Sequence, residues 1–273
     1  MADITLLCIG DVVGRPGRAV VSQAVPKLVK EREIDCVIAN VENAAAGSGL
    51  TAQLYAKFLR YGVNLMTMGD HIYRKADILP ILASSEQIVR PANYPSESVG
   101  REFAVHVTTK GKVAVISLMG RLFMHTPADC PFHAADRVLS QLPADVKVIV
   151  VDMHAETTSE KVAMGWHLEG RASVVFGTHT HIPTADECVL EGGTAYITDV
   201  GMSGPYDSVL GRRKDRVLKA TITGMPAPFD VAVGCPRMCG ILVKVDAETG
   251  RAKHVERIRV DGLPENGDVD GDD

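Results

Sequence analysis

Aromatic side chains are scarce in this chain of 273 residues, at 5%, and there is a single tryptophan. The hydrophobic fraction is nevertheless 46%, so aliphatic side chains must fill the core. This length and apolar content suit one large α/β domain or two small ones.

A basic excess is also missing. The formal net charge is −5, and removing the −6 of the tail from Asp261 to Asp273 leaves the rest of the chain at +1. A protein that binds extended nucleic acid would show a basic surplus. The balance therefore argues against a broad nucleic-acid surface, but it leaves room for a small nucleotide in one pocket.

Long apolar runs are absent. No stretch approaches the roughly 20 residues of a membrane span, and Ile4–Ile9 is too short for a signal-peptide core. Cys235 and Cys239 are the only close cysteine pair, which disfavours a structural zinc site. We therefore expect a soluble cytoplasmic protein with reduced thiols and no membrane partner.

Two common enzyme motifs are lacking as well. The segment GDVVG at 10–14 does not have the glycine spacing of a dinucleotide-binding loop. Ser22 and Ser203 lack the sequence context of a nucleophile elbow, which disfavours serine-hydrolase chemistry.

Strand-like and helix-like segments alternate through the first half of the chain, which predicts parallel strands joined by right-handed crossovers. The expected strands there are Ile4–Ile9, Asp35–Val41 and Val63–Met68, and the expected helices are Gly17–Glu33, Thr51–Tyr61 and Ala76–Ala83. Further on, the pattern predicts hairpins at 102–118 and 187–198, helices at 131–142 and 159–168, and strands at 146–152 and 172–176. Late strands at 229–233, 240–245 and 253–260 should complete a second sheet. We expect one domain over 1–260 and an acidic, disordered tail over 261–273.

Metal-binding side chains follow several of these strands. An H-x-H pair, His179 and His181, comes after the run Ala172–Phe176, and isolated pairs of this kind are weak signals. Acids, an amide and another histidine end other apolar runs, and the full set is Asp11, Glu42, Asn43, Asp70, His154, His179 and His181. Ligands of α/β sheets sit beyond the carboxyl ends of the strands, so these groups predict a catalytic metal site there.

Seven motifs now carry a family resemblance. They are GDVVGRPGR (10–18), ENAAAGSGLT (42–51), MGDHIYRKADI (68–78), RPANYP (90–95), DMHAETTSEK (152–161), GTHTHIPTAD (177–186) and TDVGMSG (198–204). Together they resemble the YmdB-like metallophosphoesterases of the calcineurin-like superfamily, in order and over nearly the whole chain. The resemblance implies an α/β fold of the four-layer αββα sandwich type with two metals at the strand ends.

The resemblance also implies roles for the residues. Asp11, Glu42, Asn43 and His181 would hold one metal. Glu42 would bridge to a second, held also by Asp70, His154 and His179. Carboxylates and imidazoles suit two divalent transition-metal ions, with iron favoured over manganese or zinc. His71 matches the general acid of the family.

Position 70 departs from the family pattern, which usually has asparagine there. Two divalent ions balanced by Asp11 and Glu42 leave a charge of +2 in such a site, and an ionised Asp70 lowers it to +1. Less positive charge should weaken phosphate binding and make bound water less acidic.

These residues predict a dinuclear metal-dependent phosphodiesterase. By resemblance its substrates are cyclic nucleotides, in particular 2′,3′-cyclic nucleoside monophosphates opened to 3′-monophosphates. Arg15, Arg18 and Arg74 lie in the site loops and could orient phosphate. Two alternatives stay open, a phosphomonoesterase or phosphoprotein phosphatase and a nucleotide-binding regulatory protein with little turnover. The residues do not decide whether the chain is a homo-oligomer.

Overall fold

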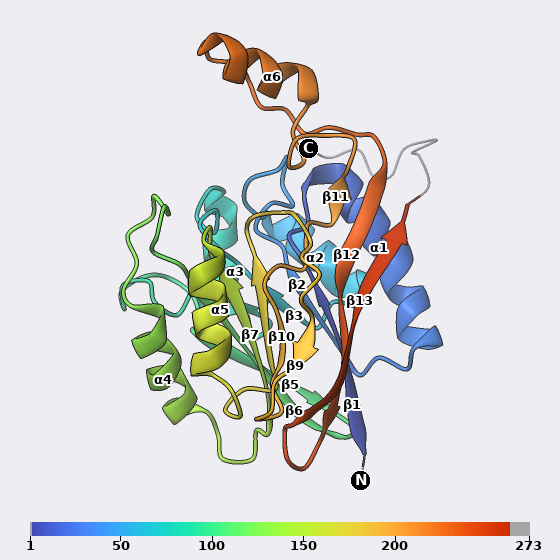
Figure 1. Cartoon of the computed structure of the whole chain (residues 1–273), viewed down its shortest axis with the longest axis vertical. Coiled ribbons are helices and arrows are strands. Elements are labelled where there is room, and N and C mark those ends of the chain that lie inside the picture. Colours follow the sequence, from blue (N-terminus) through green and yellow to red (C-terminus); the bar gives the residue numbers. More distant parts are fainter. Residues whose placement is uncertain (1, 263–273) are drawn as a thin grey trace.

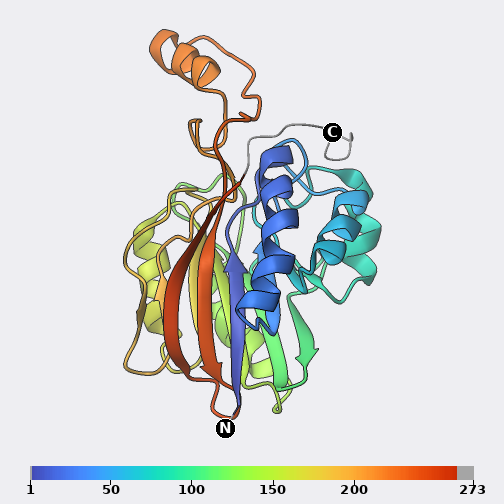
Figure 2. The same ribbon diagram turned by 90° about the vertical axis from the view of Figure 1, so that its right-hand side faces the viewer.

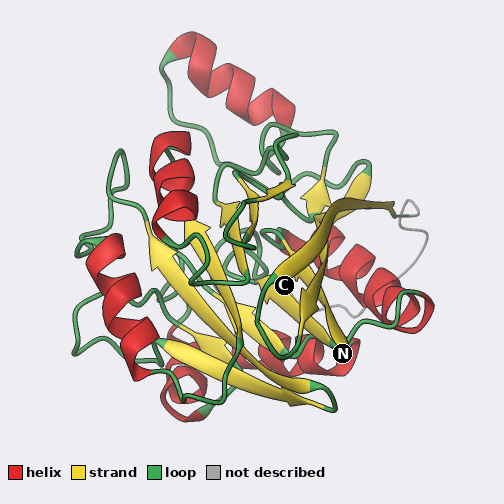
Figure 3. Ribbon diagram, turned by 60° about the horizontal axis from the view of Figure 1, so that its bottom comes forward, coloured by secondary structure: helices red, strands yellow, loops and turns green. Residues whose placement is uncertain are grey.

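Two β-sheets packed face to face, with helices on both outer sides, make up the protein (Figure 1; Figure 3). The computed structural model describes residues 2–262. Three apolar clusters separate the layers, one between the sheets and one under the helices on each side. The expected four-layer αββα architecture is therefore confirmed.

The first sheet combines the start and the end of the chain. Its strands, in spatial order, are β11 (Gly204–Pro205), β12 (Pro236–Asp246), β1 (Asp3–Ile9), β2 (Cys36–Asn40), β3 (Leu65–Thr67) and β4 (Ile88–Val89), and β13 (Ala252–Asp261) pairs with β12. Strands β1 to β4 are parallel, and β12 runs antiparallel to β1. Both faces of β1 are covered, so its sequence is almost continuously apolar.

The second sheet is built from the middle of the chain. Its spatial order is β5 (Phe103–Thr108), β6 (Gly111–Met119), β7 (Val148–His154), β8 (Val174–Thr178), β10 (Ala195–Ile197) and β9 (Cys188–Val189). Strands β6, β7, β8 and β10 are parallel. The carboxyl ends of the parallel strands in both sheets point to the same end of the molecule (Figure 2).

Helices cover the outer faces. Those on the first sheet are α1 (Gly14–Glu31), α2 (Ala52–Tyr61), and η1 (Ala76–Ile78) with α3 (Leu79–Ser84), and those on the second are α4 (Pro131–Gln141) and α5 (Thr158–His167). The Thr51 hydroxyl accepts a hydrogen bond from Leu54 N at 3.2 Å and caps α2. Gly62, at φ 95°, ends that helix in the left-handed region.

Two expectations about the late part of the chain are wrong. Strands β12 and β13 extend the first sheet rather than the second, because β12 pairs with β1 from Asp3 to Ile9. The apolar segment Phe229–Val233 is not a strand, apart from one isolated bridge between Val231 and Arg212. Asp261 is the last residue of β13, and the tail expected over 261–273 lies outside the described residues from 263 onward.

One helix was not expected from the sequence. Helix α6 (Lys214–Thr223) projects from the body of the protein and has no buried residue (Figure 2). Within residues 2–262 no helix is both long enough and apolar enough to cross a membrane.

Candidate metal centre

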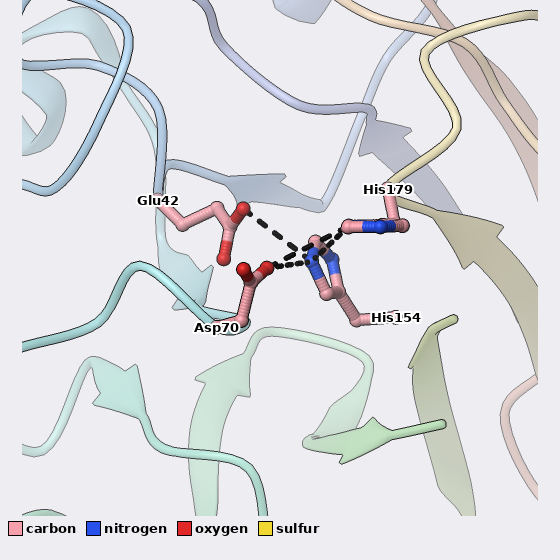
Figure 4. Close-up of side chains that lie close together, drawn as sticks. All are labelled: Glu42, Asp70, His154 and His179. Atoms are coloured by element: carbon pink, nitrogen blue, oxygen red, sulfur yellow. Dashed lines mark hydrogen bonds and ion pairs between the residues drawn. The ribbon is translucent and has the colours of Figure 1, made fainter. Parts of the chain in front are cut away.

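Side chains from both sheets meet at the shared end of the strands. Glu42 follows β2 and Asp70 follows β3, whereas His154 ends β7 and His179 follows β8. Figure 4 shows these four side chains pointing toward one another. One ligand atom from each lies within 4.8 Å of all the others. This is the spacing that ligands around a single cation adopt.

His154 is at the centre of this group. Its Nε2 lies 3.3 Å from Glu42 Oε1 and 3.1 Å from Asp70 Oδ1. Nδ1 of His179 is 3.1 Å from the same nitrogen and 3.6 Å from Asp70 Oδ1. Two imidazoles and two carboxylates therefore present lone pairs to one point.

A second group adjoins the first through Glu42. Asn43 Nδ2 lies 3.1 Å from Glu42 Oε1 and 3.4 Å from His181 Nε2, and His181 Nε2 is 3.8 Å from Asp11 Oδ1. Nδ1 of His181 donates to Leu210 O at 3.1 Å, which turns Nε2 toward Asp11. Oδ1 of Asp11 is buried and accepts no hydrogen bond from any of residues 2–262. Such an orphaned carboxylate oxygen among imidazoles fits a bound cation.

The charges in the two groups stabilise one another. Burial raises the pKa of Asp11, but His181 and His154 outweigh it and hold that pKa below its ordinary value. Burial also raises the pKa of Asp70, but the hydrogen bonds from His154 and His179 and the charges of His154 and His71 together hold that pKa well below its usual range. Burial lowers the pKa of His154, yet Glu42 and Asp70 raise it overall. His154 must be neutral to bind a cation, so a proton and a metal ion compete for its Nε2.

The backbone of the site is strained at two histidines. At one glycine it passes unusually close to two side chains of the cluster. His179 and His181 have φ angles of 89° and 64°, a region that non-glycine residues rarely adopt. Strain of this kind clusters at functional sites. A Cβ atom on Gly69 would lie 2.3 Å from the His154 ring and 2.4 Å from Glu42 Oε2. Glycine at 69 is therefore required for Asp70 to approach these side chains.

Buried polar groups orient His154 from behind. Its Nδ1 lies 2.8 Å from Thr178 Oγ1, which donates to Asp152 Oδ1 at 2.7 Å. Asp152 also accepts from Thr67 and from Asn40 Nδ2, the latter at 3.1 Å. Burial raises the pKa of Asp152 to about 6. With Nδ1 donating to Thr178, Nε2 carries the lone pair that faces the cluster.

A buried ion pair supports the loop of the H-x-H pair. Lys161 Nζ donates to Asp199 Oδ2 at 2.7 Å, and both side chains are only 1% exposed. The same carboxylate oxygen accepts from Thr180 Oγ1 at 2.6 Å, and Thr180 lies between His179 and His181. A lysine on a helix usually lies at the surface, whereas Lys161 is buried. Asp199 is the one charged residue of the motif TDVGMSG (198–204). An acid among uncharged residues was the available sequence signal for a buried carboxylate.

His71 lies at the rim of the cluster, with a side chain 24% exposed. Its Nδ1 is 2.6 Å from Asn43 Oδ1 and 3.4 Å from Glu42 Oε1. Its Nε2 is 3.6 Å from Asp70 Oδ2. The imidazole thus touches both groups while remaining open to solvent, which is where a proton donor to a bound ligand must lie.

The three arginines singled out by the sequence are outside the cluster. Nη1 of the buried Arg18 donates to Ala44 O at 2.6 Å and so supports the loop after Asn43. Arg15 and Phe229 line a cavity of about 400 Å³ beside the first turn of α1. Arg74 is exposed.

An αββα sandwich whose strand ends bring carboxylates and imidazoles from both sheets to one point is the arrangement of a calcineurin-like metallophosphoesterase. A family model described as YmdB-like protein matches residues 7–258, so the chain belongs to the YmdB-like family.

Similar proteins cover nearly the whole chain. A Bacillus subtilis (strain 168) protein named 2′,3′-cyclic-nucleotide 2′-phosphodiesterase is 44% identical over 256 residues, which is 93% of this chain and 96% of that protein. The structure of a protein from Thermus thermophilus is 38% identical with a TM-score of 0.89, covering 95% of this chain and 100% of the other. A Mycoplasma pneumoniae structure described as a phosphatase is 32% identical with a TM-score of 0.89, covering 96% and 94%.

Proposed function

We propose that this protein is a metal-dependent phosphodiesterase that opens 2′,3′-cyclic nucleoside monophosphates to 3′-monophosphates. The observation that carries the proposal is the convergence of Glu42, Asp70, His154 and His179 from two sheets. The name of the 44% identical relative supports the substrate class.

We further propose that the site holds two divalent transition-metal ions; carboxylate and imidazole ligands suit iron, manganese and zinc, and iron is our first choice. Asp11, Asn43 and His181 would hold one ion, and Asp70, His154 and His179 the other. Glu42 would bridge them, since its carboxylate lies between the two groups. When bound, the ions supply positive charge for the phosphoryl oxygens and acidify water in the site.

In this proposal His71 completes the reaction. Water adds to phosphorus as the bond from phosphorus to the 2′-oxygen breaks, and the leaving oxygen takes a proton from His71. The proton that the water gives up passes to solvent, from which His71 is protonated again. Because Nδ1 is engaged by Asn43 Oδ1, Nε2 is the nitrogen that transfers the proton. The sequence placed all three arginines in loops, but Arg15 and Arg18 are in the first turns of α1 and only Arg74 lies in a loop; they remain candidates for orienting the phosphate.

A substrate panel tests the proposed function. Metal-loaded protein should hydrolyse 2′,3′-cyclic nucleotides faster than phosphomonoesters or phosphopeptides. The reverse order would favour a monoesterase or phosphoprotein phosphatase. Nucleotide binding with retained metals and negligible turnover would favour a regulatory protein. Elemental analysis of anaerobically purified protein should find two ions per chain.

A substitution at position 71 tests the proton donor. His71→Ala should lower turnover of cyclic nucleotides by about 10²- to 10⁴-fold, the usual contribution of general acid catalysis. Aryl phosphodiesters, which need little help in departure, should suffer much less, and metal content should not change. His133→Ala, an exposed histidine on α4, is the matched control. An equal loss on both kinds of substrate would contradict the proton-donor role.

A further inference from the structure

Arg212 lies at the base of the arm that carries α6, and its guanidinium group joins two loops. Nη1 donates to Phe229 O at 3.0 Å and to Ala46 O at 3.5 Å, and Nη2 donates to Gly47 O at 2.5 Å. A guanidinium fork holds several oxygens in a fixed geometry, which the ammonium group of a lysine does not. Arg212 therefore fastens its own segment to the loop that follows β2.

The shape of the loop after β2 matches this contact. Gly47 has a φ angle of 81°, and a Cβ atom there would lie 2.4 Å from Nη1 of Arg212. Glycine at 47 is therefore needed for the backbone conformation and for the approach of the guanidinium group. The loop also closes on itself, because Gly49 N donates to Glu42 O at 2.5 Å. Through this closed loop, Arg212 is tied to the backbone beside Glu42 and Asn43.

The backbone of Arg212 closes a tight turn on the other side of the contact. Its N donates to Val209 O and its O accepts from Val209 N, both at 2.9 Å. Leu210 lies inside this turn with a φ angle of 51°, which is rare for a bulky residue. The carbonyl oxygen of Leu210 is the one that accepts from His181 Nδ1 at 3.1 Å. The turn that Arg212 closes therefore keeps His181 Nε2 directed toward Asp11.

We infer that Arg212 is a positioning residue for the ion that Asn43 and His181 would hold. Asn43 follows β2 of the first sheet and His181 follows β8 of the second, so no strand pairing joins the two segments directly. Arg212 makes the connection, because its side chain holds the loop of Asn43 and its backbone holds the partner of His181. The inference rests on the proposed function, because it requires the site with two ions.

The next residue has the same side chain without these contacts. Nε and Nη2 of Arg213 donate to Asp215 at 3.1 and 2.9 Å, and the Arg213 side chain is 47% exposed. Arg213→Met therefore removes the same charge from the same segment and leaves the contact between the loops in place. It is the matched control for a substitution of Arg212.

Arg212→Met tests the inference, because methionine keeps much of the side-chain length and none of the donors. Titration of the metal-free wild type with Mn²⁺ should find two bound ions. In the variant we expect the affinity for one ion to fall about 10- to 100-fold, the usual effect of losing a group that orients a ligand, and the affinity for the other to stay at the wild-type value. Arg212→Lys should lose less, and Arg213→Met should bind both ions normally.

Hydrogen exchange in the metal-free protein examines the turn without any ion. The amides of residues 208–213 should exchange faster in Arg212→Met than in the wild type or in Arg213→Met, because the turn has lost its anchor. An arginine that only stabilised the fold would lower the Tm of the metal-free protein and leave the ratio of the two Mn²⁺ affinities unchanged.

Four results would overturn the inference. These are wild-type affinity for both ions in Arg212→Met, an equal loss for both ions, the same defect in Arg213→Met, and weaker binding of inorganic phosphate with unchanged Mn²⁺ affinity, which would make Arg212 a substrate-binding residue. A wild type that binds fewer than two ions would instead refute the proposed site with two ions. In that case exchange of residues 208–213 would still decide whether Arg212 holds the turn beside His181.

Discussion

Asp70 faces two parts of the site at once. Its Oδ1 lies 3.1 Å from His154 Nε2, and its Oδ2 lies 3.6 Å from His71 Nε2. The family usually has asparagine at this position, which has nearly the same shape and no charge. Replacing Asp70 by asparagine therefore changes the charge of the site while nearly keeping its geometry.

Asp70→Asn should raise the positive charge of the metal-loaded site by one. We expect tighter binding of phosphate and nucleotide products, faster hydrolysis of diesters, and a rising limb of the pH–rate profile at lower pH, because a more cationic centre makes water in the site more acidic. Metal affinity should fall slightly. An unchanged pH profile with slower turnover would indicate that Asp70 serves His71 and does not bind the metal.

His154 makes metal uptake dependent on pH. In the metal-free protein its pKa is raised, because the Glu42 and Asp70 carboxylates outweigh burial. The stabilisation from its protonated form is complete below the ordinary histidine pKa of about 6.5 and is lost as pH rises through the raised value. Metal binding needs the neutral imidazole.

Metal uptake at pH 7 should therefore release a proton from His154, and affinity should rise about tenfold per pH unit up to the raised pKa. Calorimetric titration in buffers of different ionisation enthalpy measures the number of protons released. Uptake at pH 7 without proton release would show that His154 is already neutral or is not a ligand.

At the scale of elements, the segment between β8 and β10 is held by a buried ion pair whose two members come from other parts of the chain. Lys161 comes from α5, and Asp199 follows β10. Removing one member of a buried pair leaves the other charge uncompensated, which costs about 3–5 kcal/mol. Loss of Lys161 also removes its Nζ contact with Thr180 Oγ1 at 3.3 Å, and it leaves the backbone between the two histidines tied to an uncompensated carboxylate.

Lys161→Met should accordingly lower the free energy of unfolding by about 3–5 kcal/mol and weaken metal binding. Denaturant unfolding and a metal titration measure the two effects. The matched control is Lys112→Met, which breaks the exposed pair of Lys112 with Asp145 and should cost under about 1 kcal/mol. Equal losses in the two variants would mean that the buried pair does not hold the loop.

The sequence predicted the elements that a short stretch of residues specifies by itself. It missed those that depend on contacts with distant residues or that have no buried face. The buried strands, the Thr51 cap and the Gly62 helix end all follow from short patterns, and the structure contains them. Helix α6 has no buried face and therefore left no apolar periodicity. Phe229–Val233 looked like a strand because it is apolar, but Val231 packs against Gly14 instead.

At the scale of the whole molecule, the expected site residues could be chosen because parallel strands bring their carboxyl ends together. The sequence did not reveal which sheet the late strands join, because pairing between β1 and β12 links residues far apart in the chain. Nor did it reveal that Lys161 is buried, because a lysine on a helix is buried only when an acid far away in the sequence compensates its charge.

The position of β1 has a consequence for synthesis of the protein. The strand lies between β2 and β12, so one of its edges is completed only by residues 236–246. At about 5–20 residues per second, the ribosome takes roughly 10–45 s between β1 and β12. During that time an apolar strand has unpaired backbone groups along one side, which invites association with other chains. We therefore expect the nascent chain to need chaperones, or temporary cover by its own helices, until the final hairpin emerges.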